Sequence, residues 1–169
     1  MHTYQNDQYT FIGAHHSRGI EAQEQFFPGG FPGSTLVTDC LAMQISTPAA
    51  AHQICNPHLL RELKAMKQAH PEEKWPGGMT CLIKDALKRW ENGPTPRDVT
   101  NVANRLTKLL DQNQANAPGK IPAFHKRLVK HSEKVFLYLK YPDKSVPPHI
   151  NASERAIRNI KVKVKVCGE

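Results

Sequence analysis

One charged stretch near the end of the chain, Pro147–Lys161 (PPHINASERAIRNIK), places a single acidic residue among basic ones directly after two prolines. Asn151 is a good helix N-cap, and Glu154 three residues later can close a capping box on it. From Ala152 onward the spacing predicts a short helix with two isoleucines on its inward face. The role of Glu154 in this stretch depends on which other residues the fold brings near it.

The carboxylate of Glu154 has two interpretations. In the first, it caps the helix and pairs with Arg158 four residues later. In the second, it binds a metal ion, and the neighbouring arginines contact phosphate groups. The pattern alone favours the first interpretation, so the decision depends on the rest of the chain.

The composition favours one domain, or one domain with an insertion, and a polyanionic partner. The 169 residues carry a net charge of +8 with a pI near 9.4, and nucleic acid is the commonest partner of such a balance. A solvated basic surface without a partner is the alternative. No apolar run is long enough to span a membrane, and residues 1–20 hold no apolar secretory core. The four cysteines form no CxxC pair, so we expect reduced thiols in a cytoplasmic protein.

Short strand patterns fill the first part of the chain. They predict, in order, a β-hairpin over residues 2–14, a short helix over 20–26, a loop over 27–33, and brief strands over 35–38 and 52–55. The first of the two brief strands delivers Asp39 at its C-terminal end.

From Leu59 onward the hydrophobic period changes to 3.6 residues, which predicts helices. The expected helices run from residue 59 to before Pro71, over 79–90, from a cap at Thr95 to 110, and over 123–139. Thr95 is expected to cap the third of them, with proline at the next position. Lys and Val alternate over 161–166, which predicts a strand. Each apolar stripe is interpreted as plain core.

Two carboxylates of this arrangement suit metal-assisted phosphodiester chemistry. Asp39 follows a strand and Glu154 begins a later helix, and Mg²⁺ prefers such oxygen ligands. The two residues are 154 − 39 = 115 positions apart. Only a fold in which the helices form an inserted subdomain would bring them together.

Three motifs in order give the chain a specific resemblance. They are Phe31–Asp39 (FPGSTLVTD), His52–Leu63 (HQICNPHLLREL) and Asn151–Asn159 (NASERAIRN). In order and spacing, and together with Ser17–Gly19, they resemble the insertion-sequence-66 family of DDE transposases. The resemblance covers almost the whole chain.

The resemblance implies an α/β (α+β) fold, with a partial RNase H-like core interrupted by a helical insertion. The expected domains are residues 1–58 for the first part of the core, 59–146 for the insertion, and 147–169 for the helix that carries the last catalytic acid. The implied function is DNA transposition, by metal-dependent cleavage and strand transfer at DNA phosphodiesters.

The resemblance also implies roles for single residues. Asp39 would be the second catalytic acid and Glu154 the third, and both would bind Mg²⁺ or Mn²⁺. Arg155, Arg158 and Lys161 would contact DNA, either the transposon ends or the target. Self-association, or association with an intact transposase copy, is a further expected interaction.

One departure from the family pattern matters for activity. The family's first catalytic Asp lies on a central strand upstream of the hairpin, and Asp7 sits in a polar turn and does not replace it. Without that strand, the neighbouring strands would expose unpaired edges. The chain is therefore interpreted as a fragment, inactive by itself. The alternative is a non-catalytic, basic DNA-binding or regulatory remnant of a transposase.

Cys55 and His58 have the spacing of a Cys-x-x-His metal-ligand step and match a signature common near the insertion of such transposases. His52 is a further candidate ligand, but a fourth is not evident. We favour Cys55 as a small buried hydrophobe over a structural zinc site.

Overall fold

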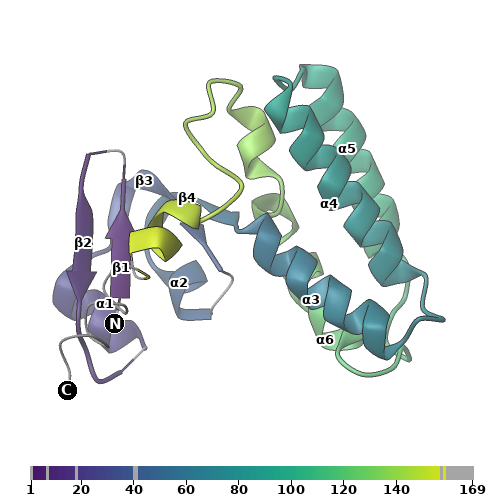
Figure 1. The fold of residues 1–169 in the computed structure, drawn as a ribbon, viewed down its shortest axis with the longest axis horizontal. Coiled ribbons are helices and arrows are strands. Elements are labelled where there is room, and N and C mark those ends of the chain that lie inside the picture. Colours follow the sequence, from purple (N-terminus) through teal and green to yellow (C-terminus); the bar gives the residue numbers. More distant parts are fainter. Residues whose placement is uncertain (1, 7, 18, 40–41, 157, 159–169) are drawn as a thin grey trace.

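The structure is a computed structural model that describes residues 2–6, 8–17, 19–39, 42–156 and 158. It has an α+β fold, as the sequence predicts. Two small sheets lie at one end of the molecule and the long helices lie at the other (Figure 1). None of the described helices is both long and apolar enough to cross a membrane.

The predicted hairpin is confirmed. Strands β1 (His2–Gln5) and β2 (Thr10–Gly13) pair antiparallel, and the Asn6 side chain accepts hydrogen bonds from two turn amides, as an Asx turn requires. Helix α1 (Ile20–Phe26) is also confirmed. It packs so closely that a Cβ at Gly13 would lie 2.6 Å from the Phe26 ring, so any larger residue there would require the ring to move.

The second sheet pairs β3 (Phe31–Thr38) with β4 (Ala49–Ile54) in parallel, and the short helix α2 (Ala42–Ser46) lies in the connection between them. Both strands start earlier than predicted, and α2 was not expected. The loop predicted over residues 27–33 is wrong from Phe31 onward, because β3 already begins there. The pairing register between β3 and β4 shifts between Phe31 and Thr35. This irregular stretch accommodates a proline that has no amide hydrogen to donate. The start of β4 is a run of alanines, which has low strand propensity.

The helices α3 (Asn56–Ala69), α4 (Trp75–Glu91), α5 (Pro96–Leu110) and α6 (Ile121–Lys130) form the other end of the molecule. The start of α5 is confirmed in detail, because Thr95 and Asp98 close a capping box. Helices α3 and α4 begin several residues before the predicted stripes, each with a proline in its first turn.

The predicted fourth helix is wrong beyond Lys130. There the chain turns into two short 3₁₀ helices, η1 (Ser132–Lys134) and η2 (Leu137–Lys140). Backbone groups that an α-helix would use internally are bonded elsewhere: the amide of Tyr138 donates to Gln53 Oε1 and the carbonyl of Val135 accepts from Gln53 Nε2, each at 3.0 Å. A buried glutamine on β4 therefore competes with the helix for these groups.

A second buried amide completes this joint between the sheet and the helices. In the orientation that satisfies both ends, the side chain of Asn56 donates to the carbonyls of Ile54 and Val135 and accepts from the Tyr138 hydroxyl at 3.0 Å. The side chains of Gln53, Asn56 and Tyr138 are fully buried. We call these three residues the buried polar joint; it fixes the chain that leads toward Pro147.

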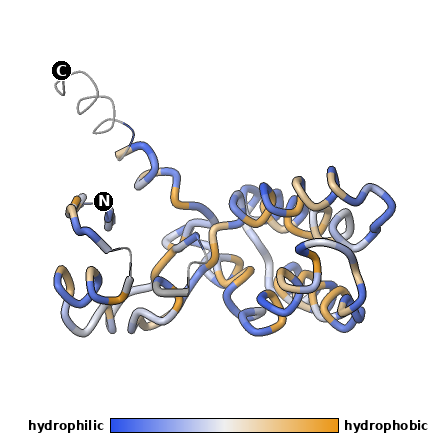
Figure 2. The backbone as a smooth tube through the Cα atoms, turned by 90° about the horizontal axis from the view of Figure 1, so that it is seen from below, coloured by the Kyte–Doolittle hydropathy of each residue, from blue (hydrophilic) through white to orange (hydrophobic). Residues whose placement is uncertain are grey.

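The main core lies among the helices. Most of its completely buried members come from α3, α4, α5 and α6, among them Leu59, Leu63, Ile83, Val102 and Leu128. Figure 2 shows the corresponding alternation of hydrophobic and hydrophilic segments along the helices. The 3.6-residue stripes thus serve as packing surfaces, as the sequence predicts.

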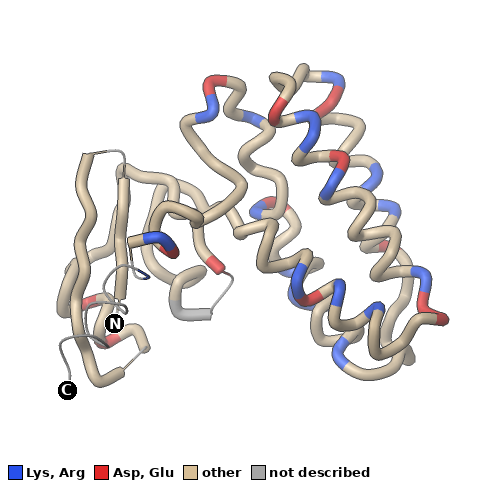
Figure 3. The backbone as a smooth tube through the Cα atoms, viewed as in Figure 1, with Lys and Arg blue, Asp and Glu red and all other residues tan. Residues whose placement is uncertain are grey.

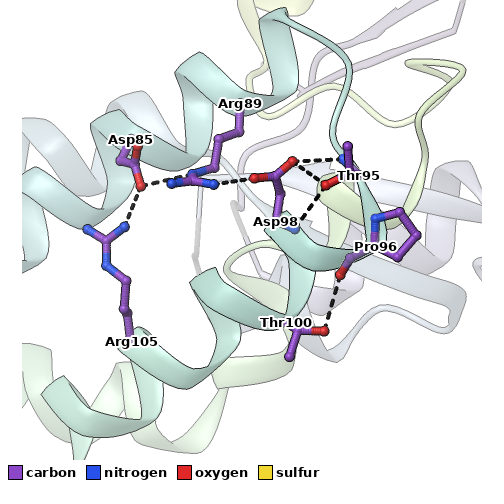
Figure 4. Close-up of polar contacts among 7 residues, drawn as sticks. All are labelled: Asp85, Arg89, Thr95, Pro96, Asp98, Thr100 and Arg105. Carbon is purple, nitrogen blue, oxygen red and sulfur yellow. Dashed lines mark hydrogen bonds and ion pairs between the residues drawn. The ribbon is translucent and has the colours of Figure 1, made fainter.

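Helices α4 and α5 are also joined by a surface ion-pair network (Figure 4). Arg89 contacts Asp85 at 3.0 Å and also pairs with Asp98, and Asp85 pairs with Arg105. The side chains of this network are between 22% and 39% exposed. Asp98 connects the network to the capping box of α5, because its carboxylate also accepts from Thr95.

Candidate metal and nucleic-acid site

Three segments that are distant in the sequence meet at the C-terminal end of the β3–β4 sheet. The amide of Cys55 donates to the carbonyl of Thr38 at 2.7 Å, and the amide of Asn56 donates to the carbonyl of Pro148 at 2.9 Å. Strands that pair in parallel end at the same edge of a sheet, so the residues that follow β3 and β4 lie together there. The segment that leads to Glu154 joins them at this edge.

Asp39 directly follows Thr38, the last residue of β3, and is half-buried. Its amide donates to the side-chain oxygen of Gln44 on α2 at 3.3 Å. The strand-end position predicted for Asp39 is therefore the position that the structure gives it.

Glu154 lies on a helical turn over residues 151–156. Its amide donates to the carbonyl of Ile150 at 3.1 Å, so Ile150 takes the N-cap position and the capping box predicted on Asn151 is wrong. The carboxylate points instead at α3, where Oε1 lies 3.3 Å from Arg61 Nη2 and 3.5 Å from His58 Nε2.

The predicted pairing of Glu154 with Arg158 is also wrong. Within the described part of the chain, the hydrogen bonds and ion pairs of this carboxylate join it to α3 only. Residues 148–154 pack against the start of α3, and this packing brings His58 and Arg61 close to Glu154. Arg61 and Glu154 are 93 positions apart in the sequence. A capping role alone thus does not account for Glu154.

Arg155 lies on the same helical turn as Glu154, and both Arg155 and Arg158 are exposed. Lys161, the third basic residue expected to contact DNA, and the strand expected over 161–166 lie outside the described residues. Among the described residues, every Lys and Arg stands at position 61 or later, so the positive charge belongs to the helices, to their loops and to the segment of Glu154 (Figure 3).

Cys55 and His58 lie beside this carboxylate. Cys55 is 1% exposed, and its Sγ atom is 3.1 Å from His58 Nδ1. Burial raises the pKa of the Cys55 thiol, so the sulfur is protonated at neutral pH. The burial agrees with the interpretation of Cys55 as a small hydrophobe; whether Cys55 and His58 bind zinc stays a prediction.

The donor chemistry at this edge fits a hard divalent cation. Asp39 and Glu154 offer carboxylate oxygens, which Mg²⁺ and Mn²⁺ prefer. The contacts of Glu154 with described residues all end on Oε1, which leaves Oε2 for a ligand. In the described ranges, no three or more His, Cys, Asp or Glu side chains are grouped so that they could hold a metal by themselves.

A cavity of about 650 Å³ opens beside the same edge. It is lined by residues of the hairpin, of β3 and of the segment between Ser145 and Ser153. Within the described residues, β1 pairs only with β2 and β3 only with β4, so each strand has one edge without a partner strand. Whether a further strand belongs between the two sheets stays a prediction.

The sequence interpretation missed the two partners of Glu154. The sequence suggests His58 as a candidate zinc ligand and gives Arg61 no role of its own. Their spacing of three residues places both on one face of α3 directly after Cys55. This spacing predicts that His58 and Arg61 share a helix face, but no nearby residue predicts their contact with Glu154.

Comparison with known proteins identifies one family. A family model described as "Transposase IS66 family" matches residues 1–169, the whole chain. No curated protein and no solved structure matches the chain.

Proposed function

The chain belongs to the IS66 family of transposases, and from this premise we propose that Asp39 and Glu154 are two of its catalytic, metal-binding acids. The family itself supports a role in DNA transposition, with DNA as the general partner. The proposal adds the residues, the metal and the chemistry.

One observation carries the proposal: a contact path joins the end of β3 to Glu154. The amide of Cys55 donates to the carbonyl of Thr38, the residue before Asp39. The sulfur of Cys55 contacts His58, and His58 contacts Glu154. Two acids 115 positions apart therefore border the same end of one sheet. In an RNase H-like core, which we propose for this fold, such acids lie at a common site.

Each residue of the proposed site has a distinct role. Asp39 and Glu154 would hold Mg²⁺ or Mn²⁺; a bound ion of this kind activates a water or a 3′-hydroxyl and stabilises the leaving oxygen. Arg155 and Arg158 would contact the phosphates on either side of the reacting bond. With two acids only, we expect weak metal binding and no strand transfer by these 169 residues alone.

Metal titration tests the acids. We expect Mn²⁺ to bind the wild-type chain, as measured by electron paramagnetic resonance of free Mn²⁺. Asp39→Asn and Glu154→Gln should each weaken the affinity by about tenfold or more, because each removes a charged ligand. Glu72→Gln is the matched control, since Glu72 is 64% exposed and lies beyond α3. Unchanged affinity in both site variants would contradict the proposal.

The second candidate function is a non-catalytic DNA-binding remnant. The charge asymmetry favours it, because every described Lys and Arg stands at position 61 or later and none of them lies in a strand. Under this alternative, DNA binding is present and Mn²⁺ binding is absent.

A DNA titration complements the metal titration. Fluorescence anisotropy of a labelled duplex, measured at several salt concentrations, gives the number of phosphates neutralised. Arg155→Gln and Arg158→Gln should each reduce the log–log salt slope by about 1. If neither variant alters the slope, these two arginines do not contact phosphate.

A further inference from the structure

His58 stands between a buried thiol and the carboxylate of Glu154. It lies in the first turn of α3, and its side chain is 23% exposed. One ring nitrogen, Nδ1, is 3.1 Å from Cys55 Sγ, and the other, Nε2, is 3.5 Å from Glu154 Oε1. The imidazole therefore connects the end of β4 to the later helical turn.

The two contacts together assign the proton of the neutral ring. A carboxylate accepts hydrogen bonds, so Nε2 must carry the hydrogen that faces Glu154. Nδ1 is then an acceptor and needs a donor. The protonated thiol of Cys55 is the donor in contact with it. The reverse tautomer would aim the lone pair of Nε2 at a negative oxygen.

The sulfur of Cys55 also lies near the start of the later helical turn. Burial raises the pKa of the thiol, and the backbone of His58 and of Ile150 acts in the opposite direction. Ile150 is the N-cap of the turn that carries Glu154. Cys55 therefore contacts the ring and lies beside the start of the helix that the ring contacts.

We propose that Cys55 and His58 form a positioning relay, in which the thiol fixes the Nε2–H tautomer of His58 and the ring orients the Glu154 carboxylate. This inference rests on the proposed metal-binding role of Glu154. His58 and Arg61 both contact Oε1, so these two contacts leave Oε2 for a metal ion. Arg61 is 63% exposed and His58 is 23% exposed. The ring is the better constrained of the two donors, because a long exposed side chain keeps more rotamer freedom. In metal sites, groups that orient a ligand contribute strongly to affinity.

A pair of amide substitutions at position 58 tests the orienting role. In His58→Gln the side-chain amide nitrogen takes the position of Nε2. In His58→Asn the amide nitrogen takes the position of Nδ1, and the Asn side chain is too short to reach Glu154. We expect the Asn variant to bind Mn²⁺ about 10-fold to 100-fold more weakly than wild type, and the Gln variant to recover most of that loss. Equal affinities for wild type and both variants would overturn the relay. Circular dichroism of each variant checks that the fold is retained.

The tautomer is measured separately, without metal. Nitrogen-15 NMR of chain labelled at its histidines distinguishes a protonated from an unprotonated ring nitrogen, and His58→Gln identifies the signals of His58. We expect Nε2–H in wild type and in Cys55→Ser, which keeps a donor, and a lower Nε2–H population in Cys55→Ala. A wild-type Nδ1–H tautomer would overturn the proposal.

The two measurements separate the two proposals. If wild type shows the Nε2–H tautomer but binds no Mn²⁺, the metal-binding role of Glu154 fails while the contact between thiol and ring stands. If wild type binds Mn²⁺ and the Asn variant binds it equally well, the proposed function stands and the orienting role of His58 fails.

Discussion

Tyr138 carries a hydroxyl that is fully buried and bonded to Asn56 at 3.0 Å. Substitution of Tyr138 by Phe removes this one group and keeps the ring, which packs edge-on against Trp90 and Phe136. The substitution therefore probes the buried polar joint without creating a large cavity. We expect a clear loss of stability, because the joint connects β4 to the segment that leads to Glu154.

The magnitude follows from what the substitution leaves behind. Asn56 is 0% exposed, so its Oδ1 would remain buried without a donor. An orphaned buried acceptor costs about 1–3 kcal/mol. For a chain of this length, each kcal/mol lowers Tm by about 2–4 °C. The carbonyls of Ile54 and Val135 keep their hydrogen bonds with Gln53, so the damage is confined to one atom.

Urea denaturation followed by circular dichroism measures the effect as a shift of the midpoint at constant slope. Tyr141→Phe is the matched control, since Tyr141 is half-buried and its hydroxyl has no hydrogen bond with the described residues. We expect the free energy of unfolding of Tyr141→Phe to stay within about 0.5 kcal/mol of wild type.

Adding Asn56→Leu to Tyr138→Phe should recover part of the lost stability, because both polar partners are then gone. If Tyr138→Phe is as stable as Tyr141→Phe, the joint does not contribute as argued.

Three further predictions concern other parts of the chain. Thr95→Ala should destabilise the protein by about 1 kcal/mol through loss of the α5 cap, whereas Thr100→Ala, also on α5, should change little in the same urea assay. At Asp85, burial raises the pKa, but the hydrogen bonds and charges of two arginines outweigh this effect, so the folded-state pKa is lowered. The contribution of Asp85 to the free energy of unfolding is therefore present above the unfolded-state pKa and is lost as the pH falls through the folded-state pKa. Asp85→Asn should therefore flatten the acid limb of stability against pH, and an unchanged limb would refute this. Peptide-resolved alkylation of the native protein should label Cys81, which is exposed, and spare Cys55, which is buried; equal labelling of the two would contradict the structure.

Local rules predicted the elements that are stabilised locally. The hairpin at residues 2–14 has turn chemistry between β-prone segments, and the N-cap at Thr95 depends only on residues within one turn of it. Prediction failed where a distant group competes for the backbone. The helix expected to run to Leu139 stops at Lys130, because Gln53 and Asn56 bond the groups that the helix would use.

The sequence by itself determined the order of the strands and of the long helices, the apolar stripes that become the core, and the three motifs that resemble the transposase family. It also marked Asp39 and Glu154 as the acids to examine. Only the tertiary structure decided which groups surround Glu154. Its contact with Arg61 spans 93 positions, and the residues next to Glu154 specify no such contact. The orientation of that carboxylate depends on how residues 148–154 pack against the start of α3, which is a property of the folded chain.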